Sequence, residues 1–157
     1  MSEHRAITAL ESLGLDHTVT RHDRVSSLAE AAAARDVQPR DLVKTLVVRR
    51  AGGDFLFVLV PGDREISWPK LRSLLGVNRL SMPDKDVAMQ ATGYERGTIT
   101  PFGSTTAWPV IADASLVGDP DREISLGAGA HGVAVTVNAE ATLEALTAQV
   151  ADVTELH

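Results

Sequence analysis

Apolar residues recur at helical spacing in the first fourteen positions of the chain. Ala6, Leu10 and Leu13 follow one another at intervals of four and three residues, which places them on one face of a helix. Ser2 has a hydroxyl group that can cap the start, and Gly14 can adopt the backbone conformation that ends a helix. The pattern predicts a helix from Ser2 to about Gly14.

Two runs of β-branched and aromatic residues give the clearest strand signal. They cover Leu42–Arg50 and Asp54–Val60, with Gly52 and Gly53 between them. Because glycine tolerates the positive φ angles of tight hairpin turns, the two runs predict a β-hairpin. Both alternating sets of side chains in the first run are largely apolar, which is typical of a strand covered on both faces.

Shorter elements complete the predicted order. A short strand ends near His22, and further strands are expected over residues 110–113, 122–126 and 133–137. Helices are expected after the caps Ser27 and Ser67, over residues 83–92, and after Asn138, where one apolar face would comprise Leu143, Leu146 and Val150. Without regular β-α-β alternation or a linker, the order favours a single α+β domain over residues 1–157, built on a mixed or antiparallel sheet.

Composition narrows the possible function classes. The chain has 157 residues, of which 44% are hydrophobic and 23% charged, as in a folded domain. The absence of cysteine excludes disulfides, thiolate zinc sites and a cysteine nucleophile. No apolar run approaches the roughly 20 residues that cross a bilayer, and the first residues lack a signal-peptide core. We therefore expect a cytoplasmic protein with no membrane partner.

The charge distribution is uneven. Fifteen Lys and Arg residues against 21 Asp and Glu residues give a net charge of −6, which argues against indiscriminate phosphate binding and against a DNA partner. Residues 1–80 hold 12 basic and 10 acidic residues, whereas residues 81–157 hold 3 and 11. A nucleic acid would therefore be bound by local contacts in the first half.

Lys44 stands out because it lies inside the apolar run VKTLVV. Side chains alternate along a strand, so its neighbours on the same face are Leu42, Leu46 and Val48. An ammonium held among leucines is unfavourable unless it meets a carboxylate, a carbonyl cluster or an anionic ligand. Two interpretations follow. Lys44 extends from the mouth of the strand to water, or it points into a cleft where it holds a phosphate, polarises a carbonyl or stabilises an oxyanion.

Residues 93–103, GYERGTITPFG, follow the spacing G-x3-G-x3-P-x-G. Three glycines and a proline within eleven residues indicate a loop of fixed shape that lets a ligand approach the backbone. A helix stop followed by a turn would explain Gly93 and Gly97, but it leaves the tail from Thr100 to Gly103 unexplained. The segment is therefore a candidate binding loop.

Residues 127–132, GAGAHG, match the glycine spacing of a dinucleotide-binding turn. Such a turn must open a helix, whereas Val133, Val135 and Val137 alternate as another strand, so we expect no nicotinamide or flavin cofactor. The segment is then a hairpin loop with one imidazole, His131, which lines a pocket or only connects two strands.

Metal sites and serine hydrolase chemistry find no support in the sequence. The other histidines, His4, His17, His22 and His157, do not pair at metal-ligand spacing, so we expect no metal. No serine lies in a G-x-S-x-G turn, so a serine nucleophile is also not expected.

The three segments together resemble one protein family. VKTLVV, GYERGTITPFG and GAGAHG followed by VAVTV, in this order and at these separations, resemble the YbaK/ProX-type aminoacyl-tRNA editing domains. The resemblance extends from about His22 to the last helix, and the RHD step at residues 21–23 agrees with it. It implies an α+β fold in which a mixed, mostly antiparallel sheet curls around a pocket and is surrounded by helices.

The resemblance also implies roles for individual residues. Lys44 would be the essential cation, in contact with the carbonyl or terminal phosphate of the substrate. The substrate-binding residues would be His22, Thr45, Gly97, Thr100, Pro101, Phe102, Gly103, Gly127, Gly129 and His131. No metal or cofactor is implied, because an aminoacyl ester is already activated and a positioned water, backbone amides and one cation suffice.

The implied activity is hydrolysis of the aminoacyl ester of mischarged tRNA, in trans, with a synthetase as a further partner. A small amino acid such as alanine or cysteine on a tRNA for proline would be removed. Contacts to the tRNA would come from Arg21, Arg24, Arg49, Arg50, Lys70 and Arg72. Because no conventional nucleophile or base is evident, a non-catalytic module that binds an acceptor end, a nucleotide or a partner protein stays open, as does a small-molecule ester hydrolase.

Overall fold

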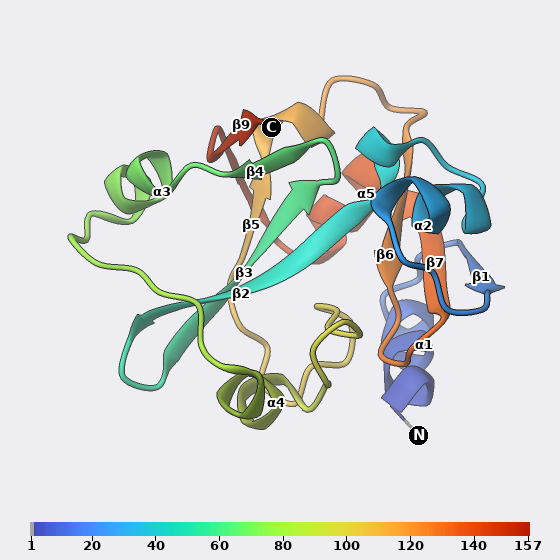
Figure 1. The fold of residues 1–157 in the computed structure, drawn as a ribbon, viewed down its shortest axis with the longest axis horizontal. Coiled ribbons are helices and arrows are strands. Elements are labelled where there is room, and N and C mark those ends of the chain that lie inside the picture. Colours follow the sequence, from blue (N-terminus) through green and yellow to red (C-terminus); the bar gives the residue numbers. More distant parts are fainter. Residues whose placement is uncertain (1) are drawn as a thin grey trace.

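A computed structural model describes residues 2–157 (Figure 1). Its helices are α1 (Ser2–Ser12), α2 (Leu28–Ala34), α3 (Trp68–Leu75), α4 (Lys85–Thr92) and α5 (Ala139–Ala145), with 3-10 turns η1 (Pro39–Asp41) and η2 (Ala114–Leu116). Its strands are β1 (His17–Arg21), β2 (Val43–Ala51), β3 (Asp54–Pro61), β4 (Arg64–Ile66), β5 (Val110–Asp113), β6 (Glu123–Gly127), β7 (Val133–Asn138), β8 (Gln149–Ala151) and β9 (Thr154–Leu156). The predicted helix caps Ser27, Ser67 and Asn138 each accept a hydrogen bond from a backbone N–H group three residues later.

The strands form three sheets. In the four-stranded sheet, of order β2-β3-β5-β8, the β2–β3 pair is antiparallel and the other two pairs are parallel. The sheet β1-β7-β6 and the pair β4-β9 are antiparallel. The predicted α+β fold with mixed, mostly antiparallel pairing is confirmed, although over residues 2–157 the strands are divided among three sheets and none of these closes into a barrel.

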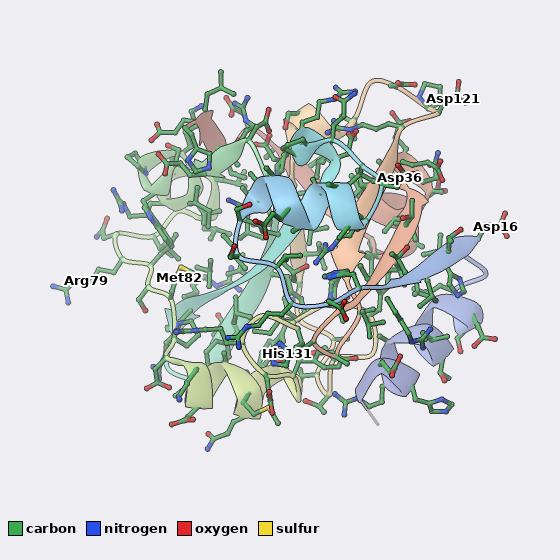
Figure 2. All side chains as sticks on the ribbon, turned by 45° about the vertical axis from the view of Figure 1, so that its right-hand side comes forward. Asp16, Asp36, Arg79, Met82, Asp121 and His131 are labelled. Carbon is green, nitrogen blue, oxygen red and sulfur yellow. The ribbon has the colours of Figure 1, made fainter. Side chains whose placement is uncertain are left out.

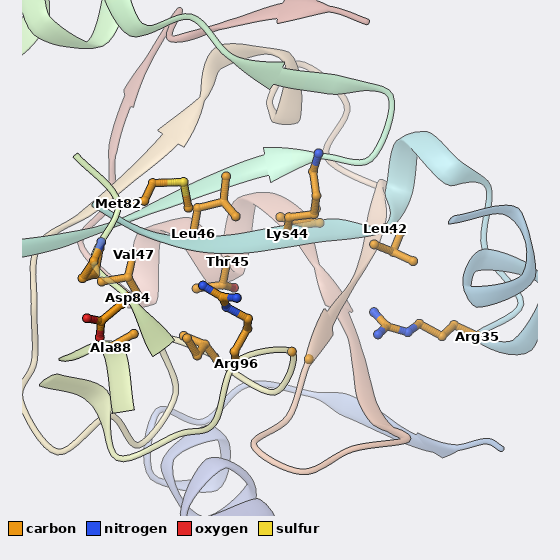
Figure 3. Close-up of a pocket in the computed structure, with 15 residues that line it drawn as sticks. Arg35, Leu42, Lys44, Thr45, Leu46, Val47, Met82, Asp84, Ala88 and Arg96 are labelled. Carbon is orange, nitrogen blue, oxygen red and sulfur yellow. The ribbon is translucent and has the colours of Figure 1, made fainter. Parts of the chain in front are cut away.

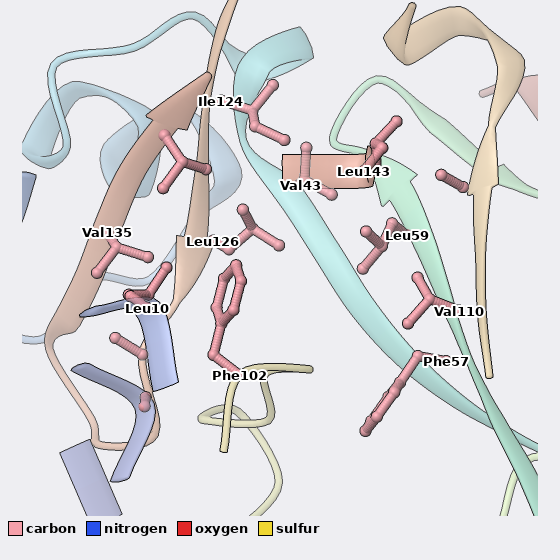
Figure 4. Packing of buried hydrophobic residues seen from close by; sticks show 14 of the residues in the cluster. Leu10, Val43, Phe57, Leu59, Phe102, Val110, Ile124, Leu126, Val135 and Leu143 are labelled. Carbon is pink, nitrogen blue, oxygen red and sulfur yellow. The ribbon is translucent and has the colours of Figure 1, made fainter. Parts of the chain in front are cut away.

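The main core lies between the two larger sheets (Figure 4). Phe57 and Leu59 from β3 face Leu126 and Val135 from β6 and β7, and Leu10 of α1 packs against the same cluster. Alternate residues of β3 point the other way, into a second core with Leu71 and Val153 on the far face. Strand β3 is therefore covered on both faces, as its continuous apolar run indicates.

The closing helix is shorter than predicted. It ends at Ala145, and the N–H group of Thr147 donates to the carbonyl oxygen of Glu144. Thr147 has a φ of 53°, a left-handed conformation that turns the chain away from the helix axis. Val150, predicted on an apolar face of this helix, lies in β8 and is exposed. The apolar residues kept helical spacing past the turn at Thr147, although the helix itself had already ended. Strands β4, β8 and β9 were not predicted.

A single bridge joins the two larger sheets near the site. Leu42 forms a parallel bridge with Ser125 of β6, and beyond it β2 and β6 separate. The free edge of β2 is next paired at Arg49, which exchanges backbone hydrogen bonds with Ser81. Within the described chain, residues 44–48 of β2 therefore pair with β3 on one edge and with no strand on the other.

Candidate functional site

A cavity of about 640 Å³ lies along the open edge of β2 (Figure 3). This volume falls within the usual range for small-ligand sites. One wall is the strand itself, and the others come from the start of α4, the loop that follows α4, the end of β6 and the end of α2. The lining residues are Arg35, Leu42, Val43, Lys44, Thr45, Leu46, Val47, Met82, Pro83, Asp84, Ala88, Arg96, Gly97, Ile99 and Gly127.

Lys44 lies on this wall, on the face of β2 that is turned toward β4. Its Nζ donates to the carbonyl oxygen of Arg64 over 3.0 Å. Burial lowers the pKa of Lys44, while the nearby carboxylates Glu65 and Asp63 oppose that shift. The ammonium therefore meets a carbonyl and an acidic neighbourhood, which are the conditions that allow a cation among leucines.

Thr45 leaves β2 on the opposite face, toward Arg96 (Figure 3). Its Oγ1 is buried and has no hydrogen-bond partner. Because N–H and C=O groups alternate between the two edges of a strand, and Arg49 directs its own to Ser81, the backbone groups of Thr45 and Val47 face the same open edge. The cavity wall thus combines one unpartnered hydroxyl group with the open-edge backbone groups of Thr45 and Val47.

The two glycine loops come together opposite β2. The N–H group of Gly129 donates to the carbonyl of Thr98 over 3.0 Å, which joins the second loop to the first. Gly97 has a φ of 89°, and a Cβ atom added to it would lie 3.6 Å from Cε1 of His131. His131 is exposed, and its Nε2 lies 3.2 Å from a carboxylate oxygen of Glu95 (Figure 2). The structure thus brings Gly97 of the first loop close to Gly129 and His131 of the second.

Four of the predicted binding residues lie elsewhere. Thr100 is fully buried, and Phe102 fills the core between the sheets (Figure 4). Pro101 lines another cavity, which Trp108 also lines. At Gly103 a Cβ atom would lie 2.6 Å from the carbonyl oxygen of Arg5, so this glycine is required for packing against α1. Residues 100–103 therefore pack against other parts of the protein and do not line the cavity beside Lys44.

A second cavity, of about 580 Å³, adjoins the first. Gly97 and Arg35 line both cavities, so the two meet at these residues. His22 lines the second cavity, where its Nδ1 donates to the carbonyl of Asp23 over 2.8 Å and its Nε2 is buried without a partner. The remaining lining residues are Asp23, Arg24, Val25, His131 and Gly132.

Sequence reasoning missed Arg35, Arg96 and Asp84 as site residues. Together with Lys44 they supply three cations and one carboxylate to the first cavity, although the whole chain carries a net charge of −6. Asp84 caps α4 by accepting from the N–H of Val87, so its position follows from the capping signal. Arg96 lies inside the candidate binding loop, next to Gly97, whereas nothing in the sequence distinguishes Arg35 from the other arginines. The placement of both depends on contacts between distant segments.

Metal and membrane features are not found in the part of the chain that the structure describes. Among residues 2–157, no three His, Asp or Glu side chains gather as metal ligands. No helix in this range has the length and hydrophobicity to cross a bilayer.

Comparison with known proteins relates the chain to tRNA editing. The family profile described as an aminoacyl-tRNA editing domain matches residues 22–145. A proline–tRNA ligase of Syntrophotalea carbinolica is 34% identical over 119 residues, which are 75% of this chain and 20% of the ligase. A proline–tRNA ligase of Geobacter sp. strain M21 is 37% identical over 92 residues, which are 59% of this chain and 16% of the ligase. The chain therefore spans a fifth or less of the length of these relatives.

A solved structure covers nearly the whole fold. It is described as that of a candidate trans-editing enzyme for prolyl-tRNA synthetase, and it superimposes with a TM-score of 0.86 at 27% identity. The match covers 98% of this chain and 97% of that one. The family profile spans most of the chain and includes both glycine loops and Lys44. By sequence and by fold, this chain belongs to the aminoacyl-tRNA editing domain family.

Proposed function

We propose that the chain is an aminoacyl-tRNA deacylase that hydrolyses the ester of mischarged tRNA in trans. The observation that carries the proposal is the convergence of unpartnered polar atoms on the Lys44 cavity and its neighbour. Thr45 Oγ1, Arg35 Nε and His22 Nε2 are three of the five buried side-chain atoms in the described residues that lack a hydrogen-bond partner. Proteins rarely bury polar groups without partners, so such a cluster supports a ligand site.

The reaction needs no nucleophilic side chain. A water molecule adds to the ester carbonyl carbon, the bond to the ribose oxygen breaks, and the products are a free amino acid and a tRNA with its terminal hydroxyl restored. Negative charge develops on the carbonyl oxygen in the transition state, where positioned donors give the largest stabilisation. Lys44 retains N–H groups beyond the one that Arg64 accepts, and the edge of β2 adds backbone N–H groups.

The cavity is suited to a small aminoacyl group, and cationic side chains line part of its wall. Its apolar lining on the Thr45 side of β2 comprises Val47, Ala88 and Ile99, and the cations Arg35 and Arg96 lie at its sides. We propose alanine or cysteine as the amino acid and a proline tRNA as the carrier, because the relatives are proline–tRNA ligases and a candidate trans-editing enzyme for prolyl-tRNA synthetase. That synthetase is then the proposed partner.

The test is a deacylation panel. The purified protein is incubated with tRNAs charged separately with alanine, cysteine, serine and proline. We expect selective loss of one mischarged ester, abolished in Lys44→Ala and retained in Lys85→Ala, which removes an exposed lysine at the start of α4. The proposal would be contradicted if the folded protein, with or without the synthetase, hydrolysed no ester faster than the spontaneous rate.

A second candidate function is a non-catalytic module that binds the acceptor end. The bond from Lys44 to the Arg64 carbonyl favours it, because that bond gives the lysine a structural role. In this case the folded protein would bind the charged tRNA and protect its ester, so the deacylation rate would fall below the spontaneous rate.

A further inference from the structure

Arg35 has an unusual position between the two cavities. It follows the last residue of α2, and its backbone N–H group donates to the carbonyl oxygen of Ala31. Its side chain is part-buried and points toward the first cavity (Figure 3), and it lines the second cavity as well. A ligand that fills both cavities must therefore pass this guanidinium group.

The guanidinium of Arg35 is poorly satisfied within the protein. Its one side-chain hydrogen bond runs from Nη1 to Ser125 Oγ over 3.5 Å, and its Nε is buried without a partner. Among residues 2–157, no carboxylate lies within ion-pair distance of it. Burial lowers the pKa of this guanidinium, yet an arginine stays charged in proteins. A partly desolvated cation without a counter-charge is unfavourable, so the site favours an anion.

Arg122 differs from Arg35 in this respect. Arg122 forms an ion pair with Asp41 at 2.9 Å and also donates to the backbone carbonyls of Ser115 and Arg40. The guanidinium of Arg122 therefore has partners within the protein that the guanidinium of Arg35 lacks. Around Arg35 the cations Arg24 and Arg96 also line the cavities.

We propose that Arg35 binds the phosphate group on the 5′ side of the substrate's terminal adenosine. The aminoacyl ester would then lie in the first cavity beside Lys44 and Thr45, and the nucleotide would continue past Arg35 and Gly97 into the second. A guanidinium offers several N–H groups in a fixed plane, which match the oxygens of a phosphate. The inference rests on the proposed function, since it assigns a part of the same substrate.

The test compares ligands that differ by one phosphate. Binding of adenosine and of adenosine 5′-monophosphate is measured by calorimetry on the wild-type protein, on Arg35→Gln and on Arg79→Gln, which changes an exposed arginine far from the site (Figure 2). We expect the monophosphate to bind about tenfold more tightly than adenosine to the wild type and to Arg79→Gln, as for a hydrogen bond to a charged group. In Arg35→Gln this preference should disappear.

Equal binding of the two ligands to the wild type, or an unchanged preference in Arg35→Gln, would overturn the proposal. If Arg35→Gln fails to fold, as judged by circular dichroism, Arg35→Lys takes its place. This variant keeps the charge but loses the paired N–H groups, and its preference should fall by about threefold or more. A preference at the wild-type level in Arg35→Lys would also count against the proposal.

Two further measurements are needed. One distinguishes a phosphate of the tRNA end from that of a free nucleotide, and the other distinguishes the role of Arg35 from the proposed deacylase activity. The trinucleotide CCA should bind at least as tightly as the monophosphate, whereas binding of the monophosphate alone would indicate a free-nucleotide site and overturn the assignment. In deacylation, Arg35→Gln should raise KM for aminoacyl-tRNA more than it lowers kcat, and it should affect aminoacyl-tRNA more than aminoacyl-adenosine, which lacks that phosphate. Phosphate preference without deacylation would refute the proposed activity alone, and deacylation without phosphate preference would refute the role of Arg35 alone.

Discussion

The polar side chains on the two faces of strand β2 differ in whether they have hydrogen-bond partners within the protein. On one face the ammonium of Lys44 donates to the carbonyl of Arg64, and the Nε of Arg64 donates to Thr154 Oγ1 and lies 3.6 Å from a carboxylate oxygen of Asp113. On the other face Thr45 Oγ1 has no partner. One face carries a connected network of polar groups, and the other carries a single hydroxyl group without a partner.

This difference separates support from recognition. A hydrogen bond to another part of the protein holds a side chain in place but uses its donor, whereas a buried group without a partner stays available to a ligand. We therefore assign the positioning of Lys44 to the Arg64 face and much of the ligand contact to the Thr45 face. Substitutions on each face should then have different effects on stability and on activity.

The largest effect is expected from Lys44→Met. This change removes the charge and keeps most of the side chain's volume. Deacylation should fall by about a hundredfold, as when one donor to a developing oxyanion is lost. Because burial lowers the pKa of Lys44, keeping the group charged at neutral pH opposes folding, so the thermal midpoint should stay within about 3 °C of the wild type.

Rates on the charged tRNA and calorimetric melting check this prediction together. Lys85→Met is the matched control, since that lysine is exposed. A large loss of stability with proportional loss of activity would show that Lys44 is structural, and the contrast between the two faces would fail.

The next effect is expected from Asp113→Asn, which breaks the supporting network. Burial alone would raise the pKa of Asp113, but hydrogen bonds from Ser115 and from the backbone N–H of Val153 outweigh it and hold this pKa below its ordinary value. Asp113→Asn should lower the free energy of unfolding by about 1–3 kcal/mol, because a buried amide has one oxygen and cannot accept all the hydrogen bonds that the carboxylate accepts. The thermal midpoint should fall by about 2–4 °C for each kcal/mol.

The pH dependence of this effect has a definite sign. A carboxyl group whose pKa is lower in the folded than in the unfolded state stabilises the fold above the unfolded pKa of about 3.9, and this contribution is lost as the pH falls through the folded pKa. Melting curves of the wild type and Asp113→Asn should therefore converge below about pH 4. Asp121→Asn, an exposed control, should follow the wild type, and parallel curves for Asp113→Asn would refute the network.

The sequence was sufficient to find Lys44 because local rules apply to it. A lysine inside an apolar strand is visible from alternation alone, and the glycine spacing marks loops that the structure brings together at Gly97 and His131. Helix caps were equally local. These signals involve residues within a few positions of one another.

Arg35 and the tail of the first loop could not be found in this way. Arg35 is set by its approach to Ser125, 90 residues away, and Gly103 by its contact with Arg5, 98 residues away. The sequence shows the first only as a basic residue at the end of a helix and the second only as part of a rigid loop. Whether each group faces a cavity or the interior depends on how the sheets pack, which spacing along the chain does not encode.

Thr45→Val should have the smallest effect and tests the open face. Valine has nearly the same shape, so the change removes only the hydroxyl. Because Oγ1 is buried without a partner, stability should be unchanged or slightly higher, whereas replacing a bonded hydroxyl would cost about 1 kcal/mol. Deacylation should fall by up to about tenfold, the value of one hydrogen bond to the substrate. Thr45→Ser should keep most of the activity. Thr18→Val, at an exposed position of β1, should change neither property. Full activity of Thr45→Val would remove the hydroxyl from the site, and a lower melting midpoint would show that it has a partner in solution.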